Sequence, residues 1–148
     1  MPATKKTLRI ALIEDDANDV FLFQRALTRG GFASPLINFK DGKEAVDYFK
    51  QLESSMTPTP KLPDIILTDI KMPRMDGIVF LHWLRGQPDL KGLPVIVVTS
   101  SVLPSDMDQG RRLGIFEFLV KEPAFENVVS TLERFLVALS KDSGSSNP

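Results

Sequence analysis

Polar side chains that could bind a metal ion or a phosphoryl group stand at the ends of several apolar runs in this sequence. They are Glu14, Asp15 and Asp16 after residues 8–13, Asp69 after residues 65–68, Thr99 and Ser100 at the end of residues 94–99, and Lys121 after residues 115–120. The stretch around Asp69 is the most informative, because the run IILT ends on this aspartate and MPRMDG follows it closely. It predicts a buried strand that ends on a carboxylate, then a stiff turn and a helix.

These residue types suit phosphoryl transfer assisted by a divalent cation. Clustered carboxylates repel one another, and oxygen ligands select Mg²⁺, Mn²⁺ or Ca²⁺ over zinc or copper. A bound cation reduces the negative charge of an incoming phosphoryl group, so that a carboxylate can attack it. A lysine can neutralise another phosphoryl oxygen, and hydroxyl or backbone N–H groups can bind the rest. We therefore predict that Asp69 is a nucleophile that accepts a phosphoryl group.

Composition excludes several other classes of protein. The chain has 148 residues, which is the size of one ordinary domain, and a net charge of -1, which gives no general attraction to nucleic acid or an anionic membrane. There are no cysteines and one histidine, so disulfides, Cys-based zinc sites and multi-His metal sites are excluded. No apolar run approaches the ~20 residues that span a bilayer, and residues 1–6 do not resemble a signal peptide. A cytoplasmic location is expected.

The hydrophobic pattern alternates between short apolar runs and helical periodicity. Strands are predicted at residues 8–13, 35–39, 65–68, 94–99 and 115–120, and helices at 18–29, 43–52, 77–86, 105–113 and 125–139. Asp16 or Asn18 could cap the first helix, and the strand opened by Pro35 is expected at a sheet edge. Residues 53–63 read as an exposed loop, residues 1–7 as a flexible lead and residues 141–148 as a disordered tail. This alternation predicts an α/β fold with a doubly wound parallel sheet, whose ligand site lies at the carboxyl ends of the strands.

With these residues in place, the sequence resembles the receiver domain of two-component response regulators, the CheY-like family. The resemblance rests on Glu14-Asp15 after the first strand, Asp69 within D-x-x-M-P-x-M-D-G, Thr99 and Lys121, and it covers residues 8–140. It implies five strands in the order 2-1-3-4-5 with five helices, in a flavodoxin-like three-layer sandwich.

The resemblance also implies a role for each matching position. Asp69 would be the phosphoacceptor and would become an aspartyl phosphate. Mg²⁺, with Mn²⁺ as an alternative, would be bound by Asp15 directly, by Glu14 through water, by Asp69 and by the backbone carbonyl of Lys71. Thr99 and Lys121 would contact the phosphoryl group, while Thr99 and Phe118 would form a switch that remodels the face of helix four, strand five and helix five.

The sequence departs from the family pattern after the fifth predicted strand. The family usually has Lys-Pro with a cis peptide bond, whereas this chain has Lys121-Glu122-Pro123. A cis bond before a non-proline residue costs about 3–4 kcal/mol, so Lys121-Glu122 is expected to be trans. The long loop at residues 53–63 and the segment at residues 88–101 are similar to stand-alone regulators associated with phytochrome-type kinases.

The leading hypothesis is thus a single-domain response regulator that is a switch and not an enzyme. Its partners would be a sensor histidine kinase and either a downstream protein or, in a phosphorelay, a histidine phosphotransfer protein; a homodimer is compatible with the sequence. No nucleic acid or membrane partner is expected.

Three alternatives remain open. A haloacid-dehalogenase-like phosphatase would carry a second aspartate where Lys71 stands, and a flavodoxin-like domain would need a glycine-rich phosphate loop after the first strand. The third alternative is a degenerate receiver used only as an interaction module.

Overall fold

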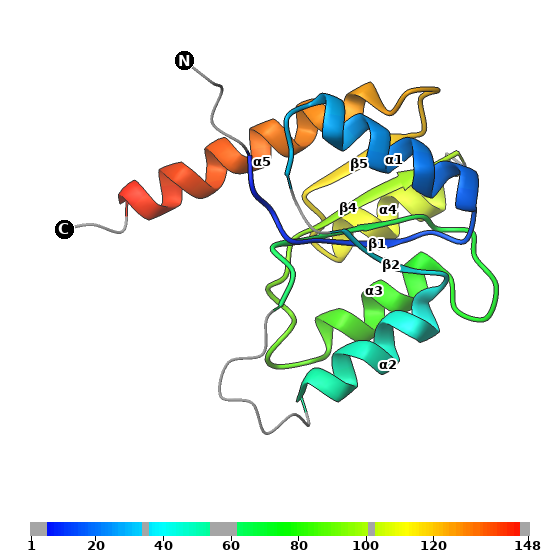
Figure 1. Ribbon diagram of the computed structural model, residues 1–148. Coiled ribbons are helices and arrows are strands. Elements are labelled where there is room, and N and C mark those ends of the chain that lie inside the picture. The colour runs from blue at the N-terminus through cyan, green and yellow to red at the C-terminus, as the bar shows by residue number, and fades with distance from the viewer. Residues whose placement is uncertain (1–5, 34–35, 54–61, 101–102, 146–148) are drawn as a thin grey trace, which may run out of the picture.

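The computed structural model describes residues 6–33, 36–53, 62–100 and 103–145. Strands and helices alternate along the chain, as the hydrophobic pattern predicts (Figure 1). The elements are β1 (Ile10–Ile13), α1 (Ala17–Arg29), β2 (Leu36–Phe39), α2 (Gly42–Glu53), β3 (Ile65–Thr68), α3 (Gly77–Arg85), β4 (Val95–Thr99), α4 (Pro104–Arg112), β5 (Glu117–Val120) and α5 (Glu126–Ser145).

The sheet has five parallel strands in the order β2-β1-β3-β4-β5, which confirms the expected fold class and strand order. Every residue of β1, β3 and β4 is buried, because these continuous apolar runs have helices on both sides. The edge strands β2 and β5 are mostly half-buried or exposed. Since all strands are parallel, their carboxyl ends share one edge of the sheet, where the predicted site residues must lie.

Helices cover both faces of the sheet (Figure 1). One hydrophobic cluster packs the sheet against α1 and α5, and a second packs it against α2 and α3, with α4 beside α3. Successive strand residues serve opposite clusters: Ile10 and Leu12 belong to the first, whereas Ala11 and Ile13 belong to the second. This period of two fixes the register of β1, so that the residues after Ile13 emerge at the edge of the sheet.

Two terminal predictions need correction. The tail was expected to begin at residue 141, but α5 continues to Ser145 and extends beyond the sheet (Figure 1). Extending an existing helix gains one hydrogen bond for each residue fixed, so polar residues can continue what the apolar face began. Lys6, assigned to the flexible lead, pairs with Phe32 in a parallel bridge, and its Nζ lies 2.7 Å from Glu133 Oε2.

The other predicted boundaries match the observed ones or differ from them by one or two residues. Glu53, predicted in a loop, ends α2, and most of that loop, residues 54–61, lies outside the described residues. Asp16 caps α1 as expected, because its side chain accepts a hydrogen bond from the Asp19 N–H. Within the described ranges, no helix is long and apolar enough to cross a membrane.

Candidate functional site

Asp69 follows β3 directly and lies almost buried, at 7% exposure. Its backbone N–H donates to the Ile13 carbonyl at 3.1 Å, which continues the pairing of β1 and β3 up to this residue. Its Oδ1 accepts a hydrogen bond of 2.6 Å from the Ile70 N–H. A Cβ at Gly77 would overlap the Asp69 carbonyl oxygen, so α3 can start this close to the site only with glycine in its first position. The Asp69 carboxylate is therefore held in a defined orientation.

Lys121 joins Asp69 to two other carboxylates. Its Nζ lies 2.9 Å from Asp69 Oδ2, 2.8 Å from Glu14 Oε1 and 2.7 Å from Asp19 Oδ2. Burial lowers the pKa of Lys121, but its contacts with Asp19, Glu14 and Asp69 outweigh this, and the net pKa is raised. The ammonium group is therefore fully charged at neutral pH.

Two further contacts position the Lys121 loop. The Lys121 N–H donates to the Thr99 carbonyl at 2.9 Å, so that the ends of β4 and β5 are joined. The Phe125 ring stacks on Phe23 of α1, with centroids 4.2 Å apart. All described peptide bonds are trans, so the prediction for Lys121-Glu122 is confirmed.

Glu14 is a buried carboxyl group, at 2% exposure. The net pKa of Glu14 is raised from 4.5 to about 7: burial is the largest cause and the nearby Asp69 charge adds to the rise, whereas contacts with Lys121 and the Asp16 N–H oppose it. Its Oε2 accepts the Asp16 N–H at 3.1 Å. Its Oε1 makes a charge contact with Lys121, but it has no hydrogen-bond partner of good geometry. Glu14 thus holds a buried oxygen that is only partly satisfied.

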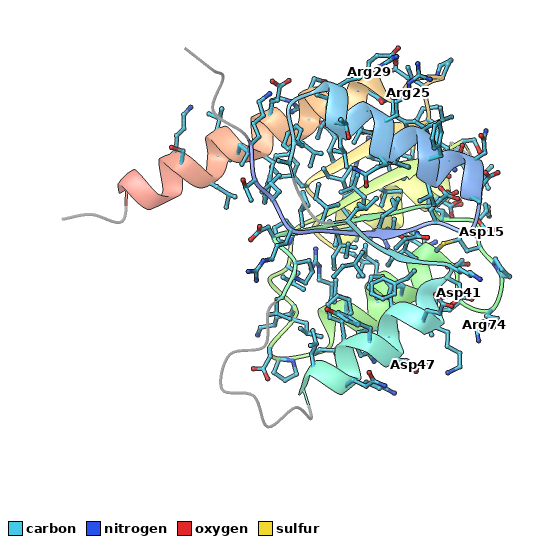
Figure 2. The ribbon with its side chains drawn as sticks, in the orientation of Figure 1. Asp15, Arg25, Arg29, Asp41, Asp47 and Arg74 are labelled. Carbon is cyan, nitrogen blue, oxygen red and sulfur yellow. The ribbon has the colours of Figure 1, made fainter. Side chains whose placement is uncertain are left out.

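Glu14, Asp15 and Asp69 form an acidic cluster that fits a divalent cation. One carboxylate oxygen from each lies within 4.8 Å of the others. Glu14 and Asp69 are buried while Asp15 is exposed, so the cluster is open to solvent on one side. Figure 2 shows Asp15 at the end of the molecule that also carries Asp41 and Arg74. With Asp19 nearby and one ammonium group among them, these carboxylates leave an excess of negative charge. The oxygen donors match those that Mg²⁺ or Mn²⁺ prefers.

The other predicted residues lie around this cluster. Thr99 is buried at the end of β4. Phe118 is half-buried and packs against Ile70, Ile78 and Val97. The exposed Lys71 side chain reaches toward α4, with Nζ 3.9 Å from Asp106 Oδ2. Asp69, Glu14 and Lys121 are thus in direct contact, with Asp15 completing the acidic cluster, whereas Phe118 belongs to the neighbouring packing layer.

Asp19 was not predicted from the sequence. It lies in the first turn of α1, and its side chain points back to the Lys121 ammonium. One signal in the sequence could have indicated it. Asp19 lies in the first turn of a helix that must begin at the carboxyl edge of the sheet, four residues after Asp15. Asp16, by contrast, is only a helix cap.

Comparison with known proteins gives related chains of similar length. A probable methanogenesis regulatory protein, FilR2, from Methanothrix harundinacea is 31% identical over 124 residues, which cover 84% of this chain and 78% of the relative. The phosphorylated cyanobacterial phytochrome response regulator RcpA superposes with a TM-score of 0.75 at 27% identity, covering 92% of this chain and 96% of RcpA. The Mn²⁺-bound response regulator Rcp1 gives a TM-score of 0.69 at 29% identity, with coverages of 84% and 87%.

A family model also matches most of the chain. It describes the response regulator receiver domain, and it matches residues 10–133, from the first residue of β1 into α5. This range contains every residue of the acidic cluster together with Lys121. The chain therefore belongs to the family of response regulator receiver domains of two-component signalling.

Proposed function

We propose that this protein is a response regulator that accepts a phosphoryl group on Asp69. The observation that carries the proposal is the position of the Asp69 carboxylate, which contacts the Lys121 ammonium at 2.9 Å and has a carboxylate oxygen of both Glu14 and Asp15 within 4.8 Å. The ammonium can stabilise added negative charge, and the acidic pair can hold a cation together with Asp69. This arrangement suits a carboxylate that becomes an acyl phosphate.

The donor would be a phosphohistidine of a sensor histidine kinase. An Asp69 carboxylate oxygen attacks the phosphorus atom, an O–P bond forms, and the P–N bond breaks with its electron pair returning to the imidazole, which takes up a proton. Lys121 would shift its contact from the Asp69 carboxylate to an oxygen of the incoming group. Water later hydrolyses the acyl phosphate and restores the carboxylate. The protein is thus a phosphoacceptor switch, with at most self-catalysed transfer and dephosphorylation, and not an enzyme that releases a product.

The proposed cation is Mg²⁺, with Mn²⁺ as an alternative. Glu14, Asp15, Asp69 and the backbone carbonyl of Lys71 would hold it, and support comes from the acidic cluster and from the similarity to the Mn²⁺-bound Rcp1. The bound cation would supply charge neutralisation for the phosphoryl oxygens. Asp15 is the exposed member and would be the first contact for an incoming ion.

The output would be a change of the surface formed by α4, β5 and α5. Thr99 would hydrogen-bond the phosphoryl group and Phe118 would turn further into its packing layer, so that a local charge event biases a two-state packing element. Apolar side chains are already exposed on or beside these elements: Leu103, Phe116, Val120, Val137 and Leu139. Such a surface could bind a downstream protein or a second copy of the chain.

The kinase would be of the phytochrome type, and the transfer would take place in the cytoplasm. Support for the type of kinase comes from the similarity to the phytochrome response regulator RcpA.

A cavity of about 120 Å³ between α1 and the loop after Lys121 offers a partner an apolar recess beside two arginines. It is lined by Leu22, Arg25, Ala26, Arg29, Pro123 and Ala124.

The alternative is a phosphorelay intermediate that passes the phosphoryl group to a histidine phosphotransfer protein. Phosphorylated protein would be mixed with such a protein, and both would be followed by intact mass. Rapid transfer would favour the relay, and retention of the phosphoryl group would favour a switch that acts by binding.

The experiment that tests phosphorylation is incubation with acetyl phosphate and Mg²⁺, followed by intact mass. The wild type should gain one phosphoryl group and Asp69→Asn none. Asp76→Asn is the matched control, because Asp76 lies in the same loop and only caps α3 by accepting the Val79 N–H, which asparagine can also do. Labelling of Asp69→Asn, or no labelling of the wild type, would contradict the proposal.

A further inference from the structure

The loop between β3 and α3, which follows Asp69 directly, contains a strained turn. The Met75 N–H donates to the Pro73 carbonyl at 2.7 Å, so that the chain reverses over three residues. Arg74, at the centre of this turn, has a φ of 64°. A three-residue turn with a positive φ at its centre is a rare form of γ-turn, and positive φ is unfavourable for a residue that has a Cβ. Another contact must therefore stabilise this conformation.

That contact is an ion pair with Asp41, the residue before α2. Arg74 Nε donates to Asp41 Oδ2 at 2.7 Å, and its Nη2 donates to Oδ1 at 3.2 Å. The pair is asymmetric, because the Asp41 side chain is 4% exposed and the Arg74 side chain 53% exposed. Burial raises the pKa of Asp41, but the bonds from Arg74 and from backbone N–H groups outweigh it and leave the pKa below its usual value. A buried carboxylate with one guanidinium partner strongly favours keeping that partner in place.

A second contact brings the same loop against the start of α2. The Gly42 N–H donates to the Met75 carbonyl at 3.0 Å. A Cβ at Gly42 would lie only 2.9 Å from both Cγ and the carbonyl oxygen of Met75, so this approach requires glycine. Asp41 also caps α2 by accepting the Glu44 N–H at 2.9 Å. The start of α2 thus contacts the turn through both Asp41 and Gly42, and Figure 2 shows Asp41 and Arg74 at the same end of the molecule.

The base of the loop is closed as well. The Gly77 N–H donates to the Ile70 carbonyl at 2.9 Å, and α3 starts against the backbone of Asp69. Residues 71–73 therefore connect a closed base to a turn that is held by hydrogen bonds to Asp41 and Gly42, while Met72 and Met75 pack against the cluster beneath α2 and α3. A change at the turn must alter the path of these residues, because little slack remains in so short a segment.

We propose that the Asp41–Arg74 ion pair is a positioning device for the cation and phosphoryl site. By holding the strained turn, it fixes the path of the chain after Asp69, including the Lys71 carbonyl. This inference rests on the proposed function, in which that carbonyl is a ligand. Neither residue belongs to the acidic cluster, so both act through the loop and are positioning residues.

Three substitutions at Arg74 separate the ion pair from the backbone strain. Arg74→Ala removes the pair and keeps the strain, and it should weaken Mg²⁺ affinity about tenfold. Arg74→Gly also removes the pair but adopts positive φ without strain, so it should recover part of that loss. Arg74→Lys keeps the charge and loses the two-point contact, so its affinity should be intermediate. In the background of Asp41→Asn, Arg74→Ala should cause little further loss, because the pair is already broken.

The matched control is Lys43→Ala. Lys43 lies two residues after Asp41, and its exposed side chain forms an ion pair of 3.3 Å with Asp47 on α2. Alanine removes this side chain and keeps the backbone N–H that bonds Asp41. The substitution should leave Mg²⁺ affinity within about twofold of the wild type. Mg²⁺ affinity would be measured by isothermal titration calorimetry, after circular dichroism has shown that each variant is folded.

A second readout needs no metal. Hydrogen–deuterium exchange of the amides of residues 70–76 would be compared in chelator, and it should be faster in Arg74→Ala but unchanged in Lys43→Ala. The inference is overturned if Arg74→Ala folds and matches the wild type in both affinity and exchange, or if Lys43→Ala has an equal effect. If the wild type itself binds no Mg²⁺ and accepts no phosphoryl group, both the proposed function and the positioning role fail. If the wild type does both and Arg74→Ala behaves identically, only the positioning role fails.

Discussion

Asp19 Oδ2 and Lys121 Nζ lie 2.7 Å apart, although the residues are separated by 102 positions in the chain. The contact joins the first turn of α1 to the loop after β5. It is shorter than the contact of Lys121 with Asp69 itself, at 2.9 Å. Lys121 is therefore held by a carboxylate outside the predicted cation site, and it can stay beside the acidic cluster when Asp69 is modified.

The first prediction concerns this contact. Asp19→Asn removes one of three carboxylates around a mostly buried ammonium, so the free energy of unfolding should fall by about 1–2 kcal/mol. Urea denaturation at neutral pH would measure it. Asp47→Asn, in an exposed ion pair with Lys43, is the control and should change stability by less than about 0.5 kcal/mol. Equal losses in the two variants would show that Asp19 adds nothing beyond an ordinary surface charge.

The second prediction is a pH dependence set by Glu14 in the absence of divalent cations. Folding raises the pKa of Glu14 from 4.5 to about 7, so the folded state binds more protons than the unfolded state between these values. Stability from this group is complete below the unfolded pKa and is lost as pH rises through the folded pKa. The difference between 4.5 and about 7, at about 1.4 kcal/mol for each pH unit, makes the loss about 3.5 kcal/mol.

The measurement is denaturant unfolding in chelator from about pH 5 to about pH 8, for the wild type and for Glu14→Gln. Subtracting the free energy of unfolding of Glu14→Gln from that of the wild type at each pH removes the contribution of the other titrating groups. The stability of the wild type relative to the variant should fall as pH rises. A constant difference would mean that Glu14 is ionised across the whole range, and a rising one would reverse the sign of the shift.

The third prediction concerns cation binding. Asp15→Asn removes an exposed ligand from the acidic cluster and should lower Mg²⁺ affinity by at least about tenfold, with little effect on the fold. Calorimetric titration with MgCl₂ would measure this. Asp16→Asn is a close control. Asp16 follows Asp15 directly but lies outside the acidic cluster, and asparagine can still cap α1. Similar losses in both variants would indicate a general charge effect instead of a defined site.

The fourth prediction separates phosphorylation from the response to it. Thr99→Ala should still accept a phosphoryl group from acetyl phosphate, because the Asp69 and Lys121 side chains are unchanged. In the wild type, phosphorylation should change the hydrogen exchange of α4 and β5. Thr99→Ala should lose this change, because the hydroxyl that would hydrogen-bond the phosphoryl group is absent. An unchanged exchange response in Thr99→Ala would remove Thr99 from the switch.

Much of the fold could be predicted from the sequence, because the signals were local. The runs in β1, β3 and β4 are almost entirely apolar, and every helix except α4 has a clear apolar face, so the position of Asp69 at a strand end followed directly. Strand order came from the family resemblance, because hydrophobic pattern alone does not state which strands are neighbours. The predicted end of α5 was wrong, because residues 141–145 are polar and carry no apolar pattern. They continue a helix that the apolar residues before them establish.

The parts of the site that were missed depend on tertiary contacts. Asp19 reaches Lys121 only because α1 and the loop after β5 meet at the same edge. The Asp41–Arg74 pair depends on the backbone conformation of Arg74, which no residue pattern specifies for a non-glycine position. Asp69, Glu14 and Lys121 were predicted because each directly follows an apolar run, and parallel strands bring such positions together.

The most direct test of the account is the identity of the phosphorylated residue. After reaction with acetyl phosphate and Mg²⁺, borohydride reduction would convert an aspartyl phosphate to homoserine, which peptide mass spectrometry can locate. The account predicts homoserine at position 69 in the wild type, and its loss when Mg²⁺ is replaced by chelator. Homoserine at another aspartate, or a phosphate on Thr68 or Thr99 in its place, would contradict the assignment of Asp69 as the phosphoacceptor.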